Sequence, residues 1–258
     1  MFHKIVSFFC FIIKSKNEHG VHSPFVFDLI TSCFYKKKGK NDLTIFLNYK
    51  KQLSKNTSLL EISNFNFMHR LLLSHKRKRS IIFKDSEISN KRARLLFHLI
   101  QYLKPKNILE IGTGLGINTV VLSSAQQNSK ITTLEENEQV VSAIKEMFKK
   151  NTFKNVKFLA GNFDITLPRV FNNNTYDFIH FKGSCANKTI LKYFESSLLS
   201  IDNNSVFLFE NIHSNKESEK VWNYIKKHEK VTVTIDTLLW GFVFFRKEQE
   251  KEHFIIRI

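Results

Sequence analysis

Three glycines, Gly112, Gly114 and Gly116, follow a short apolar stretch ending at Ile111 and precede a stretch with helical spacing. Glycine permits a tight backbone turn and lets a ligand approach the main chain closely. Amides at the start of the following helix can then bind an anionic group. A dinucleotide-binding turn has the pattern G-x-G-x-x-G, but Ile117 occupies its last position. The spacing therefore predicts a ligand-binding turn that departs from the dinucleotide pattern.

Two acidic residues flank this turn. Glu110 lies two residues before Gly112, and Glu135 ends the next predicted strand, 19 residues after Gly116. A carboxylate at that strand end can accept hydrogen bonds from both hydroxyls of a ribose. The competing interpretation of Glu135 is a solvated charge, and the neighbouring glycine turn favours ribose binding.

The elements that would position these residues alternate between strand and helix. Predicted strands cover 107–111, 130–134, 156–159, 176–181, 205–209, 231–235 and 241–245. Predicted helices between them cover 118–124, 138–149, 190–199 and 217–227. This alternation indicates an α/β fold with a mostly parallel sheet and helices on both faces. No helix fits between the last two strands, so they must form an antiparallel hairpin.

The first 88 residues predict a helical segment in front of a domain at 89–258. Ser23 would cap a helix that starts at Pro24, and Ser89 would cap a helix that ends before Pro105. The apolar run at 5–13 is far shorter than the roughly 20 residues of a membrane span. It lacks the cleavage site of a signal peptide. A buried or interfacial helix is the better prediction.

Several motifs resemble those of class I S-adenosylmethionine-dependent methyltransferases. They are 109–116 (LEIGTGLG), 134–135 (LE), 161–163 (GNF) and 176–183 (YDFIHFKG), the last of which is similar to the catechol O-methyltransferase-like group. Segments 19–27 (HGVHSPFVF), 89–97 (SNKRARLLF) and 240–249 (WGFVFFRKEQ) resemble a bacterial family of uncharacterised methyltransferases over nearly the whole chain. The resemblance implies a Rossmann-like fold of seven strands with the last strand antiparallel.

The resemblance also implies S-adenosylmethionine as the cofactor. The glycine turn would line its methionine end, Glu110 would position its amino group, and Glu135 would hold its ribose. Where the family usually has Gly-Asp-Phe at the adenine, Asn162 keeps an acceptor but loses the charge. The residues implied to bind the cofactor are Glu110, Gly112, Thr113, Gly114, Gly116, Glu135, Asn162 and Phe163.

The catalytic positions depart from the family pattern. At the end of the fourth strand, where the family usually reads Phe-Asp-Gly-Asn-His, residues 181–185 read FKGSC, so Lys182 replaces an acid. At the end of the fifth strand, where the family usually reads Asp-Asp-Ile-His-Trp, residues 210–214 read ENIHS. Glu210 and Asn211 are compatible with magnesium. A lysine opposite them makes a poor metal site, so we expect no bound metal.

Three interpretations of Lys182 follow. It is a general base if its surroundings favour the neutral amine, or it stabilises an oxyanion in place of the lost metal. Alternatively it pairs with Glu210 in a chain whose catalysis is impaired. His213 lies just past the fifth strand, where it could face an acceptor. His180 lies within the fourth strand and is more readily a packed core histidine.

Net charge and cysteine content indicate which partners and which cellular compartment suit this chain. The chain has 40 lysines and arginines against 23 aspartates and glutamates, a net charge of +17. Such charge favours a nucleic-acid partner, although a general bias toward Lys, Asn, Ile and Phe is the simpler account. Cys10, Cys33 and Cys185 contain no CxxC pair, so neither a zinc site nor a disulfide framework is indicated. A reducing cytoplasm fits best.

Three functions compete. The leading hypothesis is a cytoplasmic methyltransferase that acts on a small-molecule acceptor, at oxygen. The second is methylation of an RNA or a ribosomal component, which the basic charge favours. The third is a cofactor-binding protein whose catalysis is impaired. Residues 1–88, notably 25–34, could act as a lid over the acceptor pocket, with dimerisation or docking as the alternative.

Overall fold

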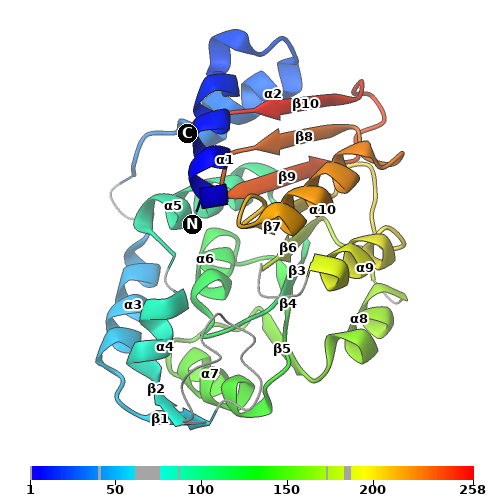
Figure 1. Ribbon diagram of the computed structural model, residues 1–258. Coiled ribbons are helices and arrows are strands. Elements are labelled where there is room, and N and C mark those ends of the chain that lie inside the picture. Colours follow the sequence, from blue (N-terminus) through cyan, green and yellow to red (C-terminus); the bar gives the residue numbers. More distant parts are fainter. Residues whose placement is uncertain (1, 40–41, 62–75, 87, 173, 183–186) are drawn as a thin grey trace. The chain divides into compact units, whose positions relative to one another are not determined.

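The computed structural model describes residues 2–39, 42–61, 76–86, 88–172, 174–182 and 187–258 (Figure 1). Contacts divide the chain into two compact units. We call Lys36–Thr166 the central unit. We call Met1–Tyr35 together with Leu167–Ile258 the terminal unit, because it contains both ends of the chain.

The central unit is built on three parallel strands with β4 in the middle. They are β3 (Asn107–Ile111), β4 (Lys130–Glu135) and β5 (Val156–Ala160). The register pairs Ile111 with Leu134 and Leu134 with Leu159. The carboxyl ends of the three strands therefore meet at one edge, which is where ligands bind in open α/β sheets.

Helices surround these strands. They are α3 (Thr44–Lys55), α4 (Arg79–Ser86), α5 (Asn90–Leu103), α6 (Ile117–Ala125) and α7 (Glu138–Lys150), and α8 (Phe163–Asn172) follows β5. A short antiparallel hairpin joins β1 (Leu59–Glu61) to β2 (Lys76–Lys78). The prediction for the start of α5 is confirmed, since Ser89 Oγ accepts from the amide of Arg92 at 3.3 Å.

The terminal unit contains five strands in the order β10-β8-β9-β7-β6. They are β6 (Phe178–Phe181), β7 (Val206–Glu210), β8 (Val233–Asp236), β9 (Trp240–Phe244) and β10 (Glu252–Ile255). β6 is parallel to β7 and β10 to β8, whereas β9 is antiparallel to both of its neighbours. The helices that lie wholly within this unit are α1 (Phe2–Lys14), α2 (Pro24–Leu29), α9 (Asn187–Ser197) and α10 (Lys216–Lys227). A short 3-10 helix spans Glu18–Gly20 and a short π-helix spans Ile30–Phe34.

The predicted α/β fold is confirmed, with one correction to the strand count. The antiparallel hairpin predicted at 231–235 and 241–245 is present as β8 and β9. The prediction of seven strands is wrong by one, because β10 follows this hairpin and lies beside β8 at the end of the strand order. A four-residue edge strand flanked by charged residues has too little alternation to be recognised from sequence.

The segment around α2 packs on β9. Ser23 Oγ accepts from the amide of Val26, which confirms the predicted helix start at Pro24. The ring centroids of Phe25 and Phe244 lie 5.1 Å apart in an edge-to-face arrangement, which is a favourable geometry for two aromatic rings. These apolar residues thus contribute to the core of the terminal unit. The predicted division at residue 88 and the lid role of this segment stay predictions.

Candidate functional site

The glycine turn joins β3 to α6 in the central unit. Gly112, Gly114 and Gly116 have φ values of 97°, 55° and 72°, in the left-handed region that glycine adopts at little cost. The amides of Gly112 and Thr113 both donate to the Leu134 carbonyl oxygen at 2.9 Å. These bonds tie the turn to the end of β4, so its conformation is fixed before any ligand binds.

Glu110 lies in β3, two residues before Gly112, and is completely buried. Its Oε2 accepts from Thr119 Oγ1 at 2.5 Å and from Thr133 Oγ1 at 2.7 Å. Its Oε1 is buried and has no hydrogen-bond partner among the described residues. A buried acceptor without a donor is costly, so this oxygen is suited to a ligand that brings a cationic N–H group.

Glu135 ends β4 beside the same turn. Its Oε2 accepts from the amide of Gly114 at 2.9 Å, and its Oε1 accepts from the amide of Asn137 at 3.2 Å. Because a carboxylate offers about four acceptor positions, two backbone donors orient the group without exhausting its capacity. The side chain is half-buried.

Asn162 and Phe163 follow β5 and begin α8. The amide of Gly161 donates to the Glu135 carbonyl oxygen at 3.1 Å, which brings this loop next to the end of β4. Asn162 is exposed, and its Oδ1 accepts from the amide of Asp164 at 2.8 Å. Phe163 is buried. The structure thus places all eight residues implied to bind the cofactor at the carboxyl edge of β3, β4 and β5, and their role stays a prediction.

Tyr49 supports the turn from α3, a contact that the sequence reasoning missed. Its hydroxyl donates to the Leu115 carbonyl oxygen at 2.8 Å, and its ring makes an edge-to-face contact with Phe148. Burial raises the pKa of Tyr49, so the phenol stays protonated and keeps this donor. No local pattern announces the contact, because Tyr49 and Leu115 are 66 positions apart.

The residues predicted to be catalytic belong to the terminal unit. Lys182 follows β6 and Glu210 ends β7, and the register of these parallel strands pairs Phe181 with Phe209. Lys182 and Glu210 therefore end neighbouring strands at the same edge. Gly183 and Cys185 of the same motif lie outside the described residues.

His180 contacts Glu210 from within β6. It is fully buried, and its Nε2 lies 3.0 Å from Glu210 Oε1. Its Nδ1 is buried without a hydrogen-bond partner among the described residues. His180 is thus buried, as a core histidine would be, and it also orients the Glu210 carboxylate.

Asn211 and His213 shape the turn after β7. Asn211 has a φ of 59°, and its amide donates to the Leu239 carbonyl oxygen at 2.6 Å. His213 Nε2 lies 2.7 Å from Asp236 Oδ2, and its Nδ1 lies 2.9 Å from Glu219 Oε1. Both ring nitrogens therefore contact carboxylates, which gives His213 a structural part. A catalytic part for either residue stays a prediction.

Comparison with known proteins identifies the family. A family model described as a methyltransferase domain matches residues 103–253, more than half of the chain. The chain belongs to this methyltransferase family. The resemblance of 109–116, 134–135, 161–163 and 176–183 to methyltransferase motifs is thereby confirmed. A search of the curated proteins finds no match.

Solved structures show the same fold. An O-methyltransferase from Bacillus cereus in complex with SAH is 16% identical, with a TM-score of 0.55, over 84% of this chain and 96% of that one. An SAH-bound methyltransferase from Podospora anserina is 16% identical, with a TM-score of 0.57, over 82% and 99% of the two chains. The O-methyltransferase TomG from Streptomyces achromogenes, in complex with SAM, is 14% identical, with a TM-score of 0.54, over 63% and 82%.

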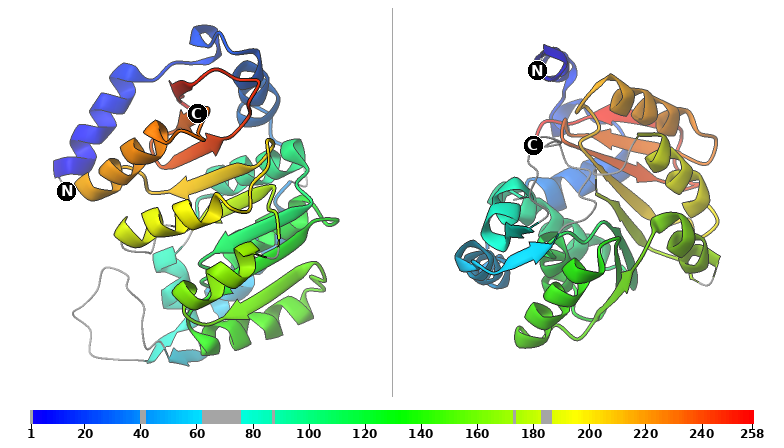
Figure 2. Two further views of the ribbon diagram at one scale, coloured as in Figure 1. Left: turned by 90° about the vertical axis from the view of Figure 1, so that its right-hand side faces the viewer. Right: turned by 60° about the horizontal axis from the view of Figure 1, so that its bottom comes forward.

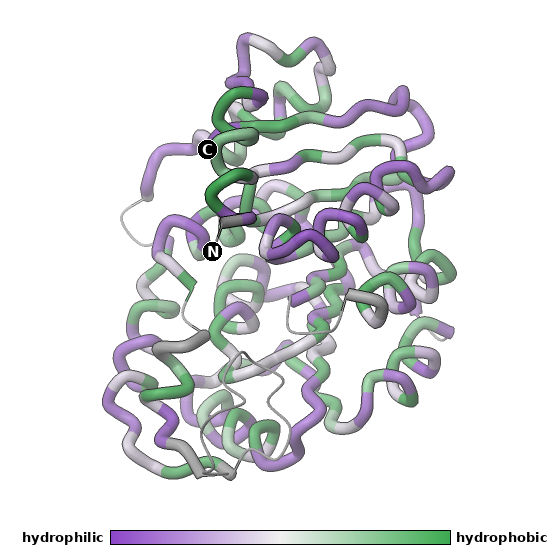
Figure 3. The backbone as a smooth tube through the Cα atoms, viewed as in Figure 1, coloured by the Kyte–Doolittle hydropathy of each residue, from purple (hydrophilic) through white to green (hydrophobic). Residues whose placement is uncertain are grey.

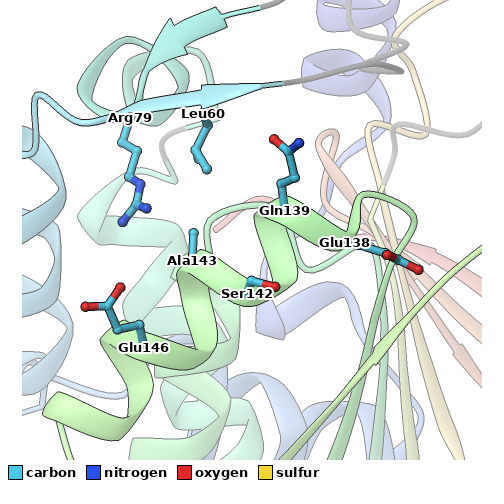
Figure 4. Close-up of a pocket in the computed structure, with 7 residues that line it drawn as sticks. All are labelled: Leu60, Arg79, Glu138, Gln139, Ser142, Ala143 and Glu146. Atoms are coloured by element: carbon cyan, nitrogen blue, oxygen red, sulfur yellow. The ribbon is translucent and has the colours of Figure 1, made fainter.

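A hollow of about 450 Å³ opens elsewhere in the central unit (Figure 4). In Figure 4 the guanidinium of Arg79 and the carboxylate of Glu146 face each other across it. Its lining residues are Leu60, Arg79, Glu138, Gln139, Ser142, Ala143 and Glu146. None of the eight residues implied to bind the cofactor lines this hollow, so it is separate from the predicted cofactor site of the methyltransferase.

Substitution of Gly116 is expected to destabilise the methyltransferase fold. A Cβ at this position would lie 2.7 Å from Phe148 Cε2 and 3.0 Å from Ile144 Cγ2, and the φ of 72° is unfavourable for alanine. We expect Gly116→Ala to lower the free energy of unfolding by about 2–4 kcal/mol, from overpacking and backbone strain together. Chemical denaturation measures this. A loss near zero would mean that α7 yields to the extra methyl group.

The His213 contacts predict a pH dependence of stability. Burial lowers the pKa of His213, but the hydrogen bonds and charges of Asp236 and Glu219 raise it by more. The pKa of His213 therefore lies above its ordinary value. Burial raises the pKa of Glu219, but Ser7, His213 and His3 outweigh this, and the net pKa is lowered.

The two shifts act in opposite pH directions. The contribution of His213 is complete below its ordinary value of 6.5 and is lost as pH rises through its raised pKa. The contribution of Glu219 is complete above its ordinary value of 4.5 and is lost as pH falls through its lowered pKa. We expect His213→Gln to reduce the fall in Tm between about pH 6 and pH 8, by a few degrees. Equal slopes for the two proteins would contradict this.

Proposed function

We propose that this methyltransferase transfers a methyl group from S-adenosylmethionine to an oxygen of a small-molecule acceptor. One observation carries the proposal: Glu110, on the strand that leads into the glycine turn, has a buried Oε1 without a partner among the described residues. An α-amino group is a cationic donor that would satisfy this oxygen. The SAM and SAH complexes of the structurally similar methyltransferases support the choice of ligand.

The remaining cofactor residues fit the rest of this ligand. The amides of the glycine turn would receive the carboxylate of its methionine end, aided by the N-terminus of α6. Glu135, oriented by the amides of Gly114 and Asn137, would accept from the ribose hydroxyls. Asn162 and Phe163 would contact the adenine. When bound, S-adenosylmethionine supplies an electrophilic methyl group that an acceptor oxygen takes up as the sulfur leaves with the bonding electrons.

The residues at the ends of β6 and β7 would then serve the acceptor. Lys182 would stabilise negative charge on the acceptor oxygen, as a divalent cation does in related enzymes. Glu210 would be held in place by His180, 3.0 Å away. Because Lys182 carries positive charge where the family has an acid, we infer that transfer does not require magnesium.

The cytoplasm would be the compartment of this protein, because Cys10 and Cys33 would remain free thiols there.

A second acceptor class, RNA, is favoured by how the charge is distributed. Residues 36–106 hold 18 of the 40 lysines and arginines but only four of the 23 aspartates and glutamates. A general compositional bias would spread lysine evenly along the chain, so it does not explain this concentration. Clustered positive charge attracts phosphate backbones.

Transfer of a labelled methyl group tests the function and separates the two acceptor classes. Labelled S-adenosylmethionine would be incubated with the protein and a cell extract, and the small molecules, RNA and protein would then be separated. We expect label in the small-molecule fraction, with or without EDTA, and none with a Gly114→Val control. Label confined to RNA would support the second class. No transfer despite cofactor binding would support the impaired, cofactor-binding alternative.

A further inference from the structure

Helix α1 contacts the rest of the terminal unit through one narrow stripe of side chains. His3 is partly buried and Ser7 and Phe11 are buried, at the four-residue spacing that lines one side of a helix. Ser7 Oγ donates to Glu219 Oε1 of α10 at 2.6 Å, and His3 Nε2 lies 3.4 Å from the same oxygen. Figure 2 shows the start of α1 close to the start of α10, from which the two helices diverge. Two of the three side chains that hold the helix in place are therefore polar.

The opposite side of α1 is apolar and exposed. At about 100° per residue, its large apolar side chains fall in one continuous arc facing away from the attached stripe. Figure 3 shows the strongly hydrophobic stretches of this helix. The exposed fractions are 50% for Ile5, 43% for Val6, 46% for Phe8, 59% for Phe9, 37% for Ile12 and 81% for Ile13.

This arrangement is the reverse of an ordinary surface helix. Such a helix buries its apolar stripe against the core and presents polar residues to water. In α1 the polar His3 and Ser7 face the protein, and the six apolar side chains face outward. A contiguous apolar surface of this kind marks an interaction site. Its occupant must itself be apolar where it meets the helix.

The charges of α1 favour an anionic surface around that apolar contact. Lys4 is exposed at one edge of the apolar arc, Lys14 is exposed on the attached side of the helix, and the sequence Phe2–Lys14 contains no acidic residue. Lysine can extend its ammonium group to a lipid headgroup while its stem covers apolar surface. The net charge of +17 lies mostly in residues 36–106, so it attracts the chain as a whole to anionic surfaces rather than α1 in particular.

The length and exposed area of α1 also decide which kind of partner its apolar face can bind. With 13 residues, α1 is about 20 Å long, shorter than the roughly 30 Å core of a bilayer. In the described part of the chain, no helix has the length and apolar character needed to cross a membrane. One exposed face of such a helix covers only a few hundred Å², below the roughly 800 Å² per partner of a stable protein interface. A helix lying flat in a lipid surface has no such requirement.

We propose that α1 docks this protein peripherally on an anionic lipid surface. The six exposed apolar side chains enter the boundary between headgroups and acyl chains, and Lys4, at the edge of this arc, contacts the headgroups. His3, Ser7 and Phe11 keep the helix attached to the terminal unit. This proposal is independent of the methyl acceptor.

Vesicle sedimentation of the full chain tests the proposal. We expect the protein to sediment with phosphatidylcholine vesicles containing roughly one-third phosphatidylglycerol, and less with pure phosphatidylcholine. Phe9→Ser combined with Ile13→Ser should weaken binding to the mixed vesicles at least about tenfold. Leu199→Ser combined with Leu239→Ser is the matched control, because these side chains are 75% and 46% exposed in the same unit. The control pair should bind as the unmodified protein does.

Four outcomes would overturn the proposal. The unmodified protein could remain in the supernatant, or the two pairs of substitutions could weaken sedimentation equally. Sedimentation unchanged by Phe9→Ser and Ile13→Ser would mean that charge alone, toward lipid or RNA, accounts for binding. A dimer that dissociates on these substitutions, without vesicle binding, would make α1 an interface between two copies. Because all four side chains are exposed, circular dichroism should show both variants folded.

Discussion

Replacement of Gly114 by valine is expected to weaken S-adenosylmethionine binding at least about a hundredfold, or roughly 2.7 kcal/mol. Gly114 has a φ of 55° in the turn between β3 and α6, and its amide donates to Glu135 Oε2 at 2.9 Å. A β-branched side chain is strongly disfavoured at positive φ, and its Cβ blocks the close approach of a ligand. Isothermal titration calorimetry measures the change.

The loss should be specific to binding. We expect Gly114→Val to remain folded, with a cost in stability of about 1–3 kcal/mol. Gly20→Val is the matched control, because Gly20 lies outside the turn and the three atoms nearest to a Cβ there all belong to the side chain of Lys16. It should bind cofactor as the unmodified protein does. Retained micromolar affinity in Gly114→Val would show that the glycine turn does not receive the cofactor.

Substitution of Lys182 by aspartate is expected to create a magnesium site that the unmodified chain lacks. An ammonium group and a divalent ion about 4 Å apart repel by about 8 kcal/mol at an effective dielectric near 20. Lys182→Asp would replace that repulsion with an oxygen ligand beside Glu210, the ligand type that magnesium prefers. Calorimetric titration with magnesium should then show at least about tenfold tighter binding than in the unmodified protein.

The matched control reverses a charge elsewhere in the same unit. Lys192 on α9 is exposed, and Lys192→Asp changes the net charge by the same amount. It should leave magnesium binding unchanged. Methyl transfer by the unmodified protein that is abolished by EDTA and restored by magnesium would contradict the account, since Lys182 would then have to lie away from the metal.

Local spacing was enough to predict the turn between β3 and α6 and the acid at the end of β4, to which the family resemblance assigns the cofactor. The glycine turn and Glu135 could be found because a strand, a turn and a helix follow one another within a short stretch of chain. The hydrogen bond between Thr133 and Glu110 could not be found in this way. Thr133 is 23 positions away, and its contact depends on the pairing of β3 with β4 rather than on any local pattern.

Within residues 89–258, two elements escaped prediction for identifiable reasons. Helix α8 contains Pro168, which lacks an amide donor and normally argues against a helix interior. Strand β10 is short and lies at an edge, paired in register with β8 by backbone bonds that any sequence can make. The roles of polar residues after β7 were equally hidden, since His213 is held by Asp236, 23 positions later in the chain.

Calorimetric titration of the unmodified protein with S-adenosylmethionine and S-adenosylhomocysteine tests the central claim most directly. The buried Glu110 Oε1 and the glycine turn predict saturable, micromolar binding of both ligands, because both carry the same amino acid and ribose groups. Measurable heats that saturate for both ligands would support the account. Absence of binding to either ligand at millimolar concentration would contradict it.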